Sequence, residues 1–299
     1  MQDTTMHTAL SKGTAVLMLA LMLAVPGMAG AQKTFATPEA AADALVESLT
    51  RHDEAQLGVV LGPDSRRLIP LDDVSAEDRT DFLAAWAAGH RIVQSSDTVA
   101  RLELQDGWTL PVPIVRTGAG WAFDPLAGMD EMRTRRIGRN ELATIQSMYA
   151  YVDAQREYAE QDRNSHDALE YAQKFLSAPG KRDGLYWPAR DGEKPSPLGP
   201  LFDTAGIQDG YHGYRFKILK AQGPAANGGA RPYVNHGRMT NGFALVAWPA
   251  RYGETGVMSF LVNHDGVVYQ KDLGPRSAAL ASAMTRFDPD ASWQALPAP

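Results

Sequence analysis

No cysteine occurs among the 299 residues of the sequence. The chain therefore forms no disulfide, no Cys–zinc site and no redox dithiol, and it has no cysteine nucleophile. Its stability has to come from hydrophobic cores alone. With 44% hydrophobic residues, the chain is long enough for two ordinary domains that need no cross-links.

Basic residues are outnumbered, because 29 Lys and Arg stand against 35 Asp and Glu and give a formal net charge of −6. The sequence also lacks a long polybasic run. A mildly acidic chain of this kind is poorly suited to bind nucleic acid or an anionic membrane surface. We therefore expect neither as a partner.

Long apolar runs are scarce as well, and the longest lies near the N-terminus. Residues 15–25 are all apolar, but eleven residues are too few to span a bilayer, which needs about 20. Lys12 precedes the run, a Pro-Gly pair ends it, and residues 29–31 have the A-x-A pattern of a cleavage site. We expect residues 1–31 to be a signal peptide cleaved after Ala31, the alternative being an uncleaved anchor. The mature chain would then be periplasmic or secreted, without a membrane span or a lipidated Cys.

Motifs of nucleophilic and metal catalysis are missing too. The sequence has no Gly-x-Ser-x-Gly elbow, no Ser-x-x-Lys pair in a suitable place and no glycine-rich loop ending in Gly-Lys-Ser/Thr. Its histidines form no pair at metal-ligand spacing, and three of them directly precede Asp, a local pattern common at turns and helix ends. We expect no catalytic residue, no metal site and no cofactor. The three histidines are His52, His166 and His264.

A partial calcium-loop pattern occurs at Asp162, Asn164 and Asp167. A calcium loop needs an Asp or Asn at its fifth position, Gly at the sixth and Glu at the twelfth. Here His166 stands fifth, Asp167 stands sixth, and Glu170 comes too early. The pattern therefore indicates a solvated helix start.

Residues 32–135 combine three helical patterns with three strand patterns. Thr37 and Pro38 begin the first helix, residues 55–61 form a second, and a capping box at residues 75–78 begins a third. Helices followed by an antiparallel meander predict an α+β domain, similar in outline to nuclear-transport-factor-like cone domains. The third helix is expected to bury Phe82, Leu83 and Trp86, and the strands are expected at residues 98–104, 108–115 and 121–123.

Residues 136–299 predict a second α+β domain, in which two helices precede an antiparallel sheet. The helices are expected at residues 140–160 and 165–176. A loop rich in Pro and Gly follows at residues 180–210, and then three strands, with a glycine-rich excursion at residues 223–229 between the first and the second. A helix and a tail end the chain from Ser277.

The most informative segment is residues 240–274, where three β-rich runs are separated by turn signals. The Asp-Gly pair within residues 263–266 suits the positive φ angles of a tight hairpin between the second and third runs. Alternation predicts Phe260 and Val262 on one face of the sheet and Leu261 on the other.

This segment resembles the C-terminal signature of the bacterial family called domain of unknown function 2950. Residues 135–159 and 170–188 resemble the same family, so the resemblance covers most of the mature chain. It implies a small exported protein of Gram-negative bacteria, and it implies no activity, because no reaction or catalytic residue is assigned to that family.

The C-terminal half also resembles the globular heads of type IV pilins and pseudopilins. A long helix, a variable loop and an antiparallel sheet occur in the same order, and residues 213–216 (Gly-Tyr-Arg-Phe) are similar to the first strand of those sheets. The prepilin cleavage motif and the hydrophobic assembly helix are absent. The resemblance therefore implies a pilin-head-like fold but not a pilus subunit.

The best binding candidate is the loop at residues 181–188, which gathers cations, an acid and two aromatics. Aromatic faces beside Arg and Asp suit the recognition of sugars or peptides. Tyr211, Tyr214 and Tyr233 would extend this surface. The alternative, which we favour, is that the aromatics pin a long loop onto the sheet. The loop residues concerned are Lys181, Arg182, Asp183, Tyr186 and Trp187.

Arginines cluster before the expected helix at residues 140–160 and predict either a polar network at the domain junction or a solvated helix start. Basic residues oppose the dipole at a helix N-terminus. We therefore expect an Asp or Glu of the same chain to pair with Arg136 or Arg139. Arg135, Asn140 and Glu141 would belong to the same network.

Taken together, these patterns favour a non-enzymatic binding or assembly-accessory protein of the cell envelope, whose partner is an envelope protein or a glycan. The alternative is a cell-envelope hydrolase that uses a carboxylate pair, such as Glu170 and Asp183, near Tyr186 and Trp187. Such a pair acts on glycosides when the carboxyl groups lie about 5–10 Å apart.

Overall fold

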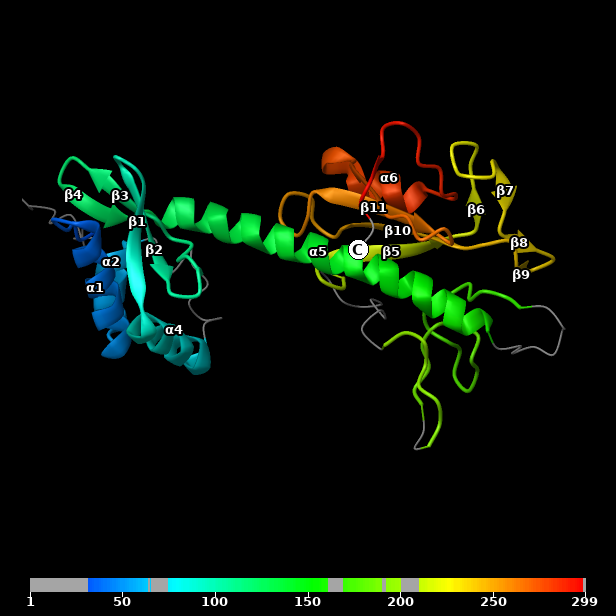
Figure 1. The fold of residues 1–299 in the computed structure, drawn as a ribbon, viewed down its shortest axis with the longest axis horizontal. Helices are drawn as coiled ribbons and strands as arrows, with labels where there is room; N and C mark the ends of the chain where they lie inside the picture. Colours follow the sequence, from blue (N-terminus) through cyan, green and yellow to red (C-terminus); the bar gives the residue numbers. More distant parts are fainter. Residues whose placement is uncertain are drawn as a thin grey trace, which may run out of the picture.

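The computed structural model describes residues 32–63, 65, 75–160, 169–189, 192–199 and 210–297. Helices and antiparallel sheets alternate along the chain, which confirms the predicted α+β class. The hydrophobic residues gather in two clusters, one in each half of the chain, and one long helix runs between them (Figure 1).

The first half packs three helices against a four-stranded antiparallel meander of order β1-β2-β3-β4. Phe35, Leu45, Ile114 and Phe123 lie at the centre of its core. The elements are α1 (Pro38–Thr50), α2 (Glu54–Leu61), α4 (Ala76–Ala88), β1 (His90–Ser96), β2 (Val99–Leu104), β3 (Ile114–Thr117) and β4 (Gly120–Phe123).

Side-chain caps fix the starts of these helices, and two of the three caps lie where the sequence predicts them. The Thr37 hydroxyl accepts a hydrogen bond from the Ala40 amide at 3.2 Å, and Asp53 caps α2 in the same way. Ser75 and Asp78 form the predicted capping box. These caps satisfy amides that have no partner within the helix.

Two expectations for this half are wrong, and one strand was not expected. Strand β1 is not anticipated by the sequence patterns, and α4 buries no residue completely, since Phe82, Leu83 and Trp86 are only half-buried. The strand expected at residues 108–115 begins only at Ile114. Pro111 and Pro113 explain the delay, because proline has no N–H to donate to a strand ladder.

Helix α5 (Pro125–Ala159) is the longest element, with 35 residues. The start expected at Asn140 is wrong. The helix begins 15 residues earlier, at Pro125, and the Asp124 carboxylate accepts hydrogen bonds from the amides of Leu126 and Ala127. Two glycines in the early turns have low helix propensity and weaken the periodic signal there. The domain boundary expected at residue 135 consequently lies inside the helix.

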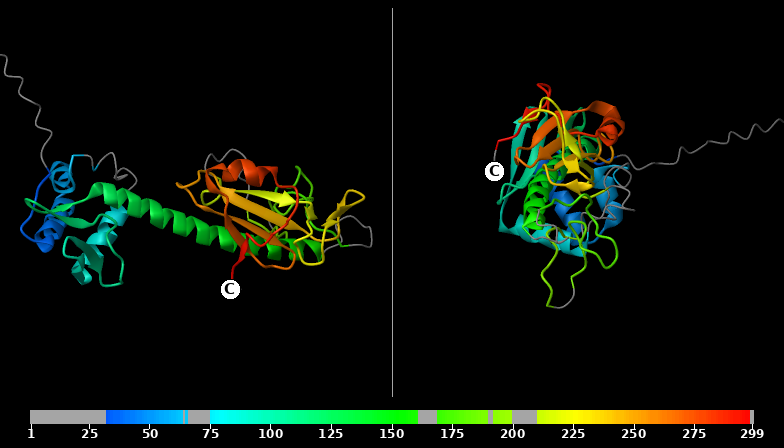
Figure 2. Two further views of the ribbon diagram at one scale, coloured as in Figure 1. Left: turned by 90° about the horizontal axis from the view of Figure 1, so that it is seen from above. Right: turned by 90° about the vertical axis from the view of Figure 1, so that its right-hand side faces the viewer.

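The first turns of α5 belong to the N-terminal half. Gly128 lies so close to β-meander residues that an added Cβ would stand 2.7 Å from Cγ2 of Val112. Arg135 donates hydrogen bonds of 2.7 Å to both the carbonyl and the hydroxyl of Thr109. One helix therefore forms part of both halves of the molecule (Figures 1 and 2).

The second half contains a five-stranded antiparallel sheet of order β13-β12-β11-β10-β5. Helix α5 contacts β10 and β11 on one face, and the short helix α6 (Ser277–Ala283) covers β10 on the other (Figure 2). The strands are β5 (Tyr214–Leu219), β10 (Ala244–Pro249), β11 (Met258–Asn263), β12 (Tyr269–Asp272) and β13 (Gln294–Ala295).

The predicted hairpin between β11 and β12 is confirmed. The Gly266 amide donates to the Asn263 carbonyl at 2.9 Å, and Gly266 has a φ of 83°. Phe260, Leu261 and Val262 are all buried, so the alternation of faces does not separate core from solvent. The reason is that helices cover both faces of the central strands.

The three strands expected in this half are too few, because the described residues form five strands in the sheet and further short strands in the connection from β5 to β10. Two small hairpins interrupt it, β6 (Ala221–Gln222) with β7 (Arg231–Pro232) and β8 (Val234–Asn235) with β9 (Arg238–Met239). The predicted glycine-rich excursion is the turn between β6 and β7. A 3₁₀ turn, η3 (Gly274–Arg276), leads into α6.

The second helix expected at residues 165–176 is wrong for its described part, residues 169–176, which contains no helix. Residues 165–168, and with them the calcium-like residues 162–167, lie outside the described ranges. The buried Gln155 of α5 holds this segment extended, since its amide group exchanges two hydrogen bonds of 2.8 Å with the backbone of Ala172. The Tyr171 amide donates to the Met239 carbonyl at 2.8 Å.

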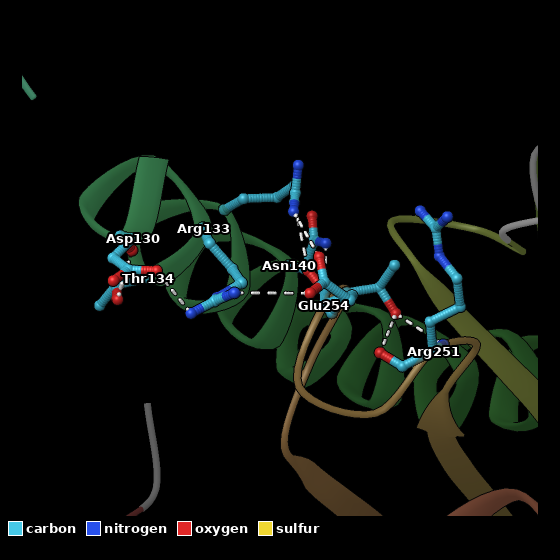
Figure 3. A network of polar contacts seen from close by, with 8 residues as sticks. Asp130, Arg133, Thr134, Asn140, Arg251 and Glu254 are labelled. Atoms are coloured by element: carbon cyan, nitrogen blue, oxygen red, sulfur yellow. Dashed lines mark hydrogen bonds and ion pairs between the residues drawn. The ribbon is translucent and has the colours of Figure 1, made fainter. Parts of the chain in front are cut away.

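The predicted polar network at the junction is present, although it lies within α5 and not at a helix start. Nη2 of Arg136 lies 3.2 Å from Oε2 of Glu254, which confirms an acidic partner for that arginine. Figure 3 shows Arg133 extended toward the same carboxylate and Asn140 beside it. One turn further along, Oε1 of Glu141 accepts the amides of Val257 and Met258, both at 2.9 Å. The network therefore joins α5 to the loop between β10 and β11.

Candidate functional site

The predicted binding loop is held against the sheet domain by its backbone. The Tyr186 amide donates to the Phe175 carbonyl at 2.8 Å, and the Ser177 amide donates to the Tyr186 carbonyl at 2.9 Å. Gly184 is pressed against the backbone of Leu176, leaving no room for a side chain. The loop is thus a docked segment with a defined outer surface.

Two of the predicted binding aromatics lie in the core. Trp187 is only 6% exposed, and Tyr214 is fully buried. The Tyr214 hydroxyl donates to the Met258 carbonyl at 2.9 Å, and burial, followed by the charge of Glu141, raises the pKa of Tyr214 above its ordinary value. Tyr233 is also fully buried. These positions agree with the alternative interpretation, in which aromatics pin the loop to the sheet.

The remaining predicted residues lie nearer the surface. Lys181 and Arg182 are exposed, and Tyr186 and Tyr211 are half-buried. Arg182 forms an ion pair with Glu193 at 3.1 Å, and its guanidinium lies 5.6 Å from the ring centroid of Trp187. The loop therefore offers cations, rather than open aromatic faces, to a ligand.

Asp183 is the best-positioned polar residue of the loop. Its carboxylate accepts hydrogen bonds from Nζ of Lys174 at 2.8 Å and from the Ala178 amide at 2.9 Å. Partial burial alone would raise the pKa of Asp183. The hydrogen bonds and the charge of Lys174 outweigh that effect, so this pKa lies below its ordinary value.

Asp183 lines a hollow of about 330 Å³ together with residues from three separate segments of the chain. Glu170 lies in the same hollow and forms an ion pair with Arg238 at 3.1 Å. We call this site the charged hollow. It is lined by Tyr158, Glu170, Tyr171, Gln173, Lys174, Asp183, Gly237 and Arg238.

The charged hollow is better suited to recognition than to hydrolysis. A glycosidase needs one protonated carboxyl group as general acid. The lowered pKa keeps Asp183 ionised near neutral pH, and Glu170 is held by a guanidinium. Two cations beside two carboxylates can instead bind a ligand that carries charges of both signs.

Most lining residues of the charged hollow were missed by the sequence analysis. Tyr171, Gln173 and Lys174 lie in the segment wrongly expected to be helical, and Arg238 lies in a hairpin with no strong sequence signal. Lys174 contacts Asp183 across 9 residues of sequence, and Arg238 contacts Glu170 across 68. The one available signal was the pair Glu170 and Asp183, which the structure places in one hollow.

Two of the three histidines that precede Asp have structural partners. Nδ1 of His52 lies 2.7 Å from Nη1 of Arg79, and Nε2 of His264 lies 3.0 Å from Nη2 of Arg231. Burial lowers the pKa of His264, although the negative charge of Asp265 acts in the opposite direction. Within the described ranges, no group of three or more His, Asp or Glu side chains is arranged to hold a metal ion. His166 lies outside those ranges.

The comparisons with known proteins identify a family but no characterised relative. The family described as protein of unknown function (DUF2950) matches residues 32–296. No curated protein and no solved structure matches the chain. The resemblance to pilin heads consequently stays a prediction.

The lowered pKa of Asp183 predicts a pH-dependent contribution to stability. Because the folded pKa lies below the unfolded value near 4, the contribution is complete above about pH 5 and is lost as the pH falls through the folded pKa. We expect Asp183→Asn to lower the free energy of unfolding by about 0.5–1 kcal/mol at pH 7, as for a partly exposed ion pair, and by less at pH 3. Urea denaturation at both pH values measures this.

Asp43→Asn is the control, since Asp43 is exposed on α1. Equal destabilisation by Asp183→Asn at pH 7 and pH 3 would contradict the assignment.

Proposed function

From its membership of the DUF2950 family, to which the chain belongs, we propose an exported, non-enzymatic binding protein of the bacterial cell envelope. Its ligand is the peptidoglycan of the cell wall, a glycan whose stem peptides carry both amino and carboxylate groups. The charged hollow, with Lys174, Asp183, Glu170 and Arg238 around one opening, is the observation that carries the proposal.

Charge complementarity supports a ligand with charges of both signs. Each cation in the hollow already has a carboxylate partner, so a purely anionic ligand would meet Glu170 and Asp183 as repelling charges. A ligand with both signs pairs with all four groups. Tyr171, which is half-buried in the lining, supplies an aromatic face of the kind that sugars contact.

Lys181 and Arg182 extend the positive charge of the site onto the adjacent loop surface. The overall charge of −6 supports neither nucleic acid nor an anionic lipid surface as the partner. An envelope protein with mixed charges is the second class of partner, and the binding experiment below distinguishes it from a glycan.

A hydrolase remains the second candidate, because the structure brings Glu170 and Asp183 to one hollow. Against it stand the ion pairs that hold both carboxylates and the lowered pKa of Asp183. In a binding role, both carboxylates can keep their ion pairs with Lys174 and Arg238.

Export is supported by the N-terminal pattern and by the extent of the family match, which begins at residue 32. Gln32, the first residue after the predicted cleavage site, is already part of the fold. Its Nε2 donates to the Phe123 carbonyl at 2.6 Å. Among the described residues, no helix combines the length and the apolarity needed to cross a membrane.

We expect the protein expressed with its leader in a Gram-negative host to appear in the periplasmic fraction with Gln32 as its first residue. Intact-mass spectrometry and N-terminal sequencing of that fraction measure this. Replacing Ala29 and Ala31 by Leu removes the small residues of the cleavage site, so the uncleaved mass is expected. The proposal of export is wrong if the unaltered chain keeps residues 1–31 or stays in the cytoplasm.

We expect the mature protein to co-sediment with purified, protein-free peptidoglycan sacculi. Lys174→Glu places a third carboxylate in the charged hollow and removes the partner of Asp183, so binding should fall at least about fivefold. Lys220→Glu makes the same charge change at an exposed lysine outside the hollow and should bind normally. Sedimentation over a series of sacculus concentrations measures the affinity.

Three outcomes would contradict the proposal: the mature protein fails to co-sediment, Lys174→Glu binds normally, or both variants lose binding equally. Release of soluble muropeptides from the sacculi, abolished by Glu170→Gln, would favour the hydrolase instead. Absence of sacculus binding together with Lys174-dependent cross-linking to an envelope protein would assign the site to a protein partner.

A further inference from the structure

A second cavity lies in the N-terminal half, far in sequence from the charged hollow. It has a volume of about 460 Å³, which falls within the usual range of about 300–1,000 Å³ for small-molecule sites. Helices α1, α2 and α4 and the strand region from β2 onward enclose it. We call it the apolar pocket. It is lined by Leu45, Leu49, Leu57, Leu61, Asp78, Arg79, Asp81, Phe82, Ala85, Leu104, Trp108, Leu110 and Val112.

The base of the apolar pocket is hydrocarbon and its rim is aromatic. Leu45, Leu61 and Val112 are at most 5% exposed. Trp108 is 41% exposed and meets the edge of the Phe82 ring at a centroid distance of 6.1 Å. These large side chains leave part of their apolar surface exposed to water. A ligand that covers this surface gains a binding free energy of about 25 cal/mol per Å².

The apolar pocket also explains why α4 has no fully buried residue. An amphipathic helix normally buries its apolar stripe against the core. Here Phe82 and Ala85 face the pocket and are only half-buried. This face of α4 borders the pocket, whereas the helix contacts α1 and β1 elsewhere.

Arg79 is a cation in the lining of the apolar pocket and indicates the chemistry of the ligand's head group. Its Nη1 contacts His52, and its guanidinium forms no ion pair with a carboxylate among the described residues. The carboxylate of Asp78 is engaged in the capping box with Ser75. The guanidinium can therefore pair with an oxygen acceptor of a ligand.

We propose that the apolar pocket binds a single aliphatic chain whose head group presents an oxygen acceptor to the guanidinium of Arg79. A fatty acid or a fatty alcohol has this chemistry. Asp81 lies on the same rim and disfavours a head group with several negative charges. The proposal goes beyond peptidoglycan binding and stands independently of it, because no residue lines both sites.

The first experiment uses the neutral fluorescent probe N-phenyl-1-naphthylamine with the mature protein and displaces it by decanoate, decanol or decyltrimethylammonium. We expect probe binding and displacement by decanoate and decanol. Decyltrimethylammonium offers no acceptor oxygen and should displace the probe at least about fivefold less well. No probe binding, or equal displacement by all three compounds, would overturn the proposal.

A matched pair of variants on α4 locates the site. Ala85→Trp fills the apolar pocket and should abolish probe binding, whereas Ala84→Trp adds the same side chain on the exposed face and should leave binding unchanged. Loss of binding in both variants, or in neither, would overturn the assignment. Thermal denaturation establishes that each variant is folded.

Trp108 gives a second readout that does not depend on filling the pocket. 11-Bromoundecanoate should quench part of the tryptophan fluorescence of the unaltered protein, because bromine quenches an indole in contact with it. Trp108→Phe keeps the aromatic rim and should remove the quenchable part. Arg79→Lys keeps the charge but removes the guanidinium, and it should weaken decanoate at least about threefold while the probe binds normally. Unchanged quenching in Trp108→Phe would contradict the proposal.

Discussion

The two halves of this protein share one helix, α5, whose first turns contact the N-terminal core and whose later turns pack against β10 and β11. The first turns close the N-terminal core at Gly128, where only hydrogen fits against Val112. The later turns bury Met148, Tyr151 and Val152 against the second sheet. At about 1.5 Å per residue, 35 residues give a helix about 50 Å long, more than either core could cover alone.

Polar contacts, in addition to apolar burial, fix how the second sheet sits on this helix. Glu141 accepts two successive amides at the start of β11, and Arg136 holds the loop that precedes them. A carboxylate that accepts two backbone amides leaves little freedom of register, because moving the strand by one residue would unpair both donors. The central strands can then be covered on both faces, by α5 and by α6.

Structure that depends on residues close together in the sequence was predictable, whereas contacts between residues far apart in the sequence were not. The caps at Thr37 and Ser75 and the hairpin at Gly266 depend on residues within four positions of one another, and the structure has them where they were expected. The start of α5 was missed because its early turns contain glycine and arginine instead of an apolar stripe. The helix expected after residue 165 was wrong for its described part because a buried glutamine of α5 competes for the backbone.

The residues of the candidate sites show the same difference between what the sequence predicts and what only tertiary packing creates. Asp183 and Glu170 were recognisable as acids near aromatics, but their partners Lys174 and Arg238 are brought to the hollow only by tertiary packing. Trp187 and Tyr214 are of residue types that are common on binding surfaces, but both are buried in the core. The apolar pocket had no sequence signal, since the leucines that line it follow the same periodicity as leucines that fill a core.

One measurement tests the shared helix directly, and the absence of native cysteine makes it straightforward. Spin labels on cysteines introduced at the exposed positions Leu126 and Asp153 lie on opposite sides of the residue-135 boundary expected from sequence. A continuous helix places these two backbone positions about 40 Å apart along its axis. Double electron–electron resonance should therefore give a narrow distance distribution centred near 40 Å, within the reach of the label side chains. A broad distribution, or one centred well below that distance, would contradict a continuous helix α5 and the account built on it.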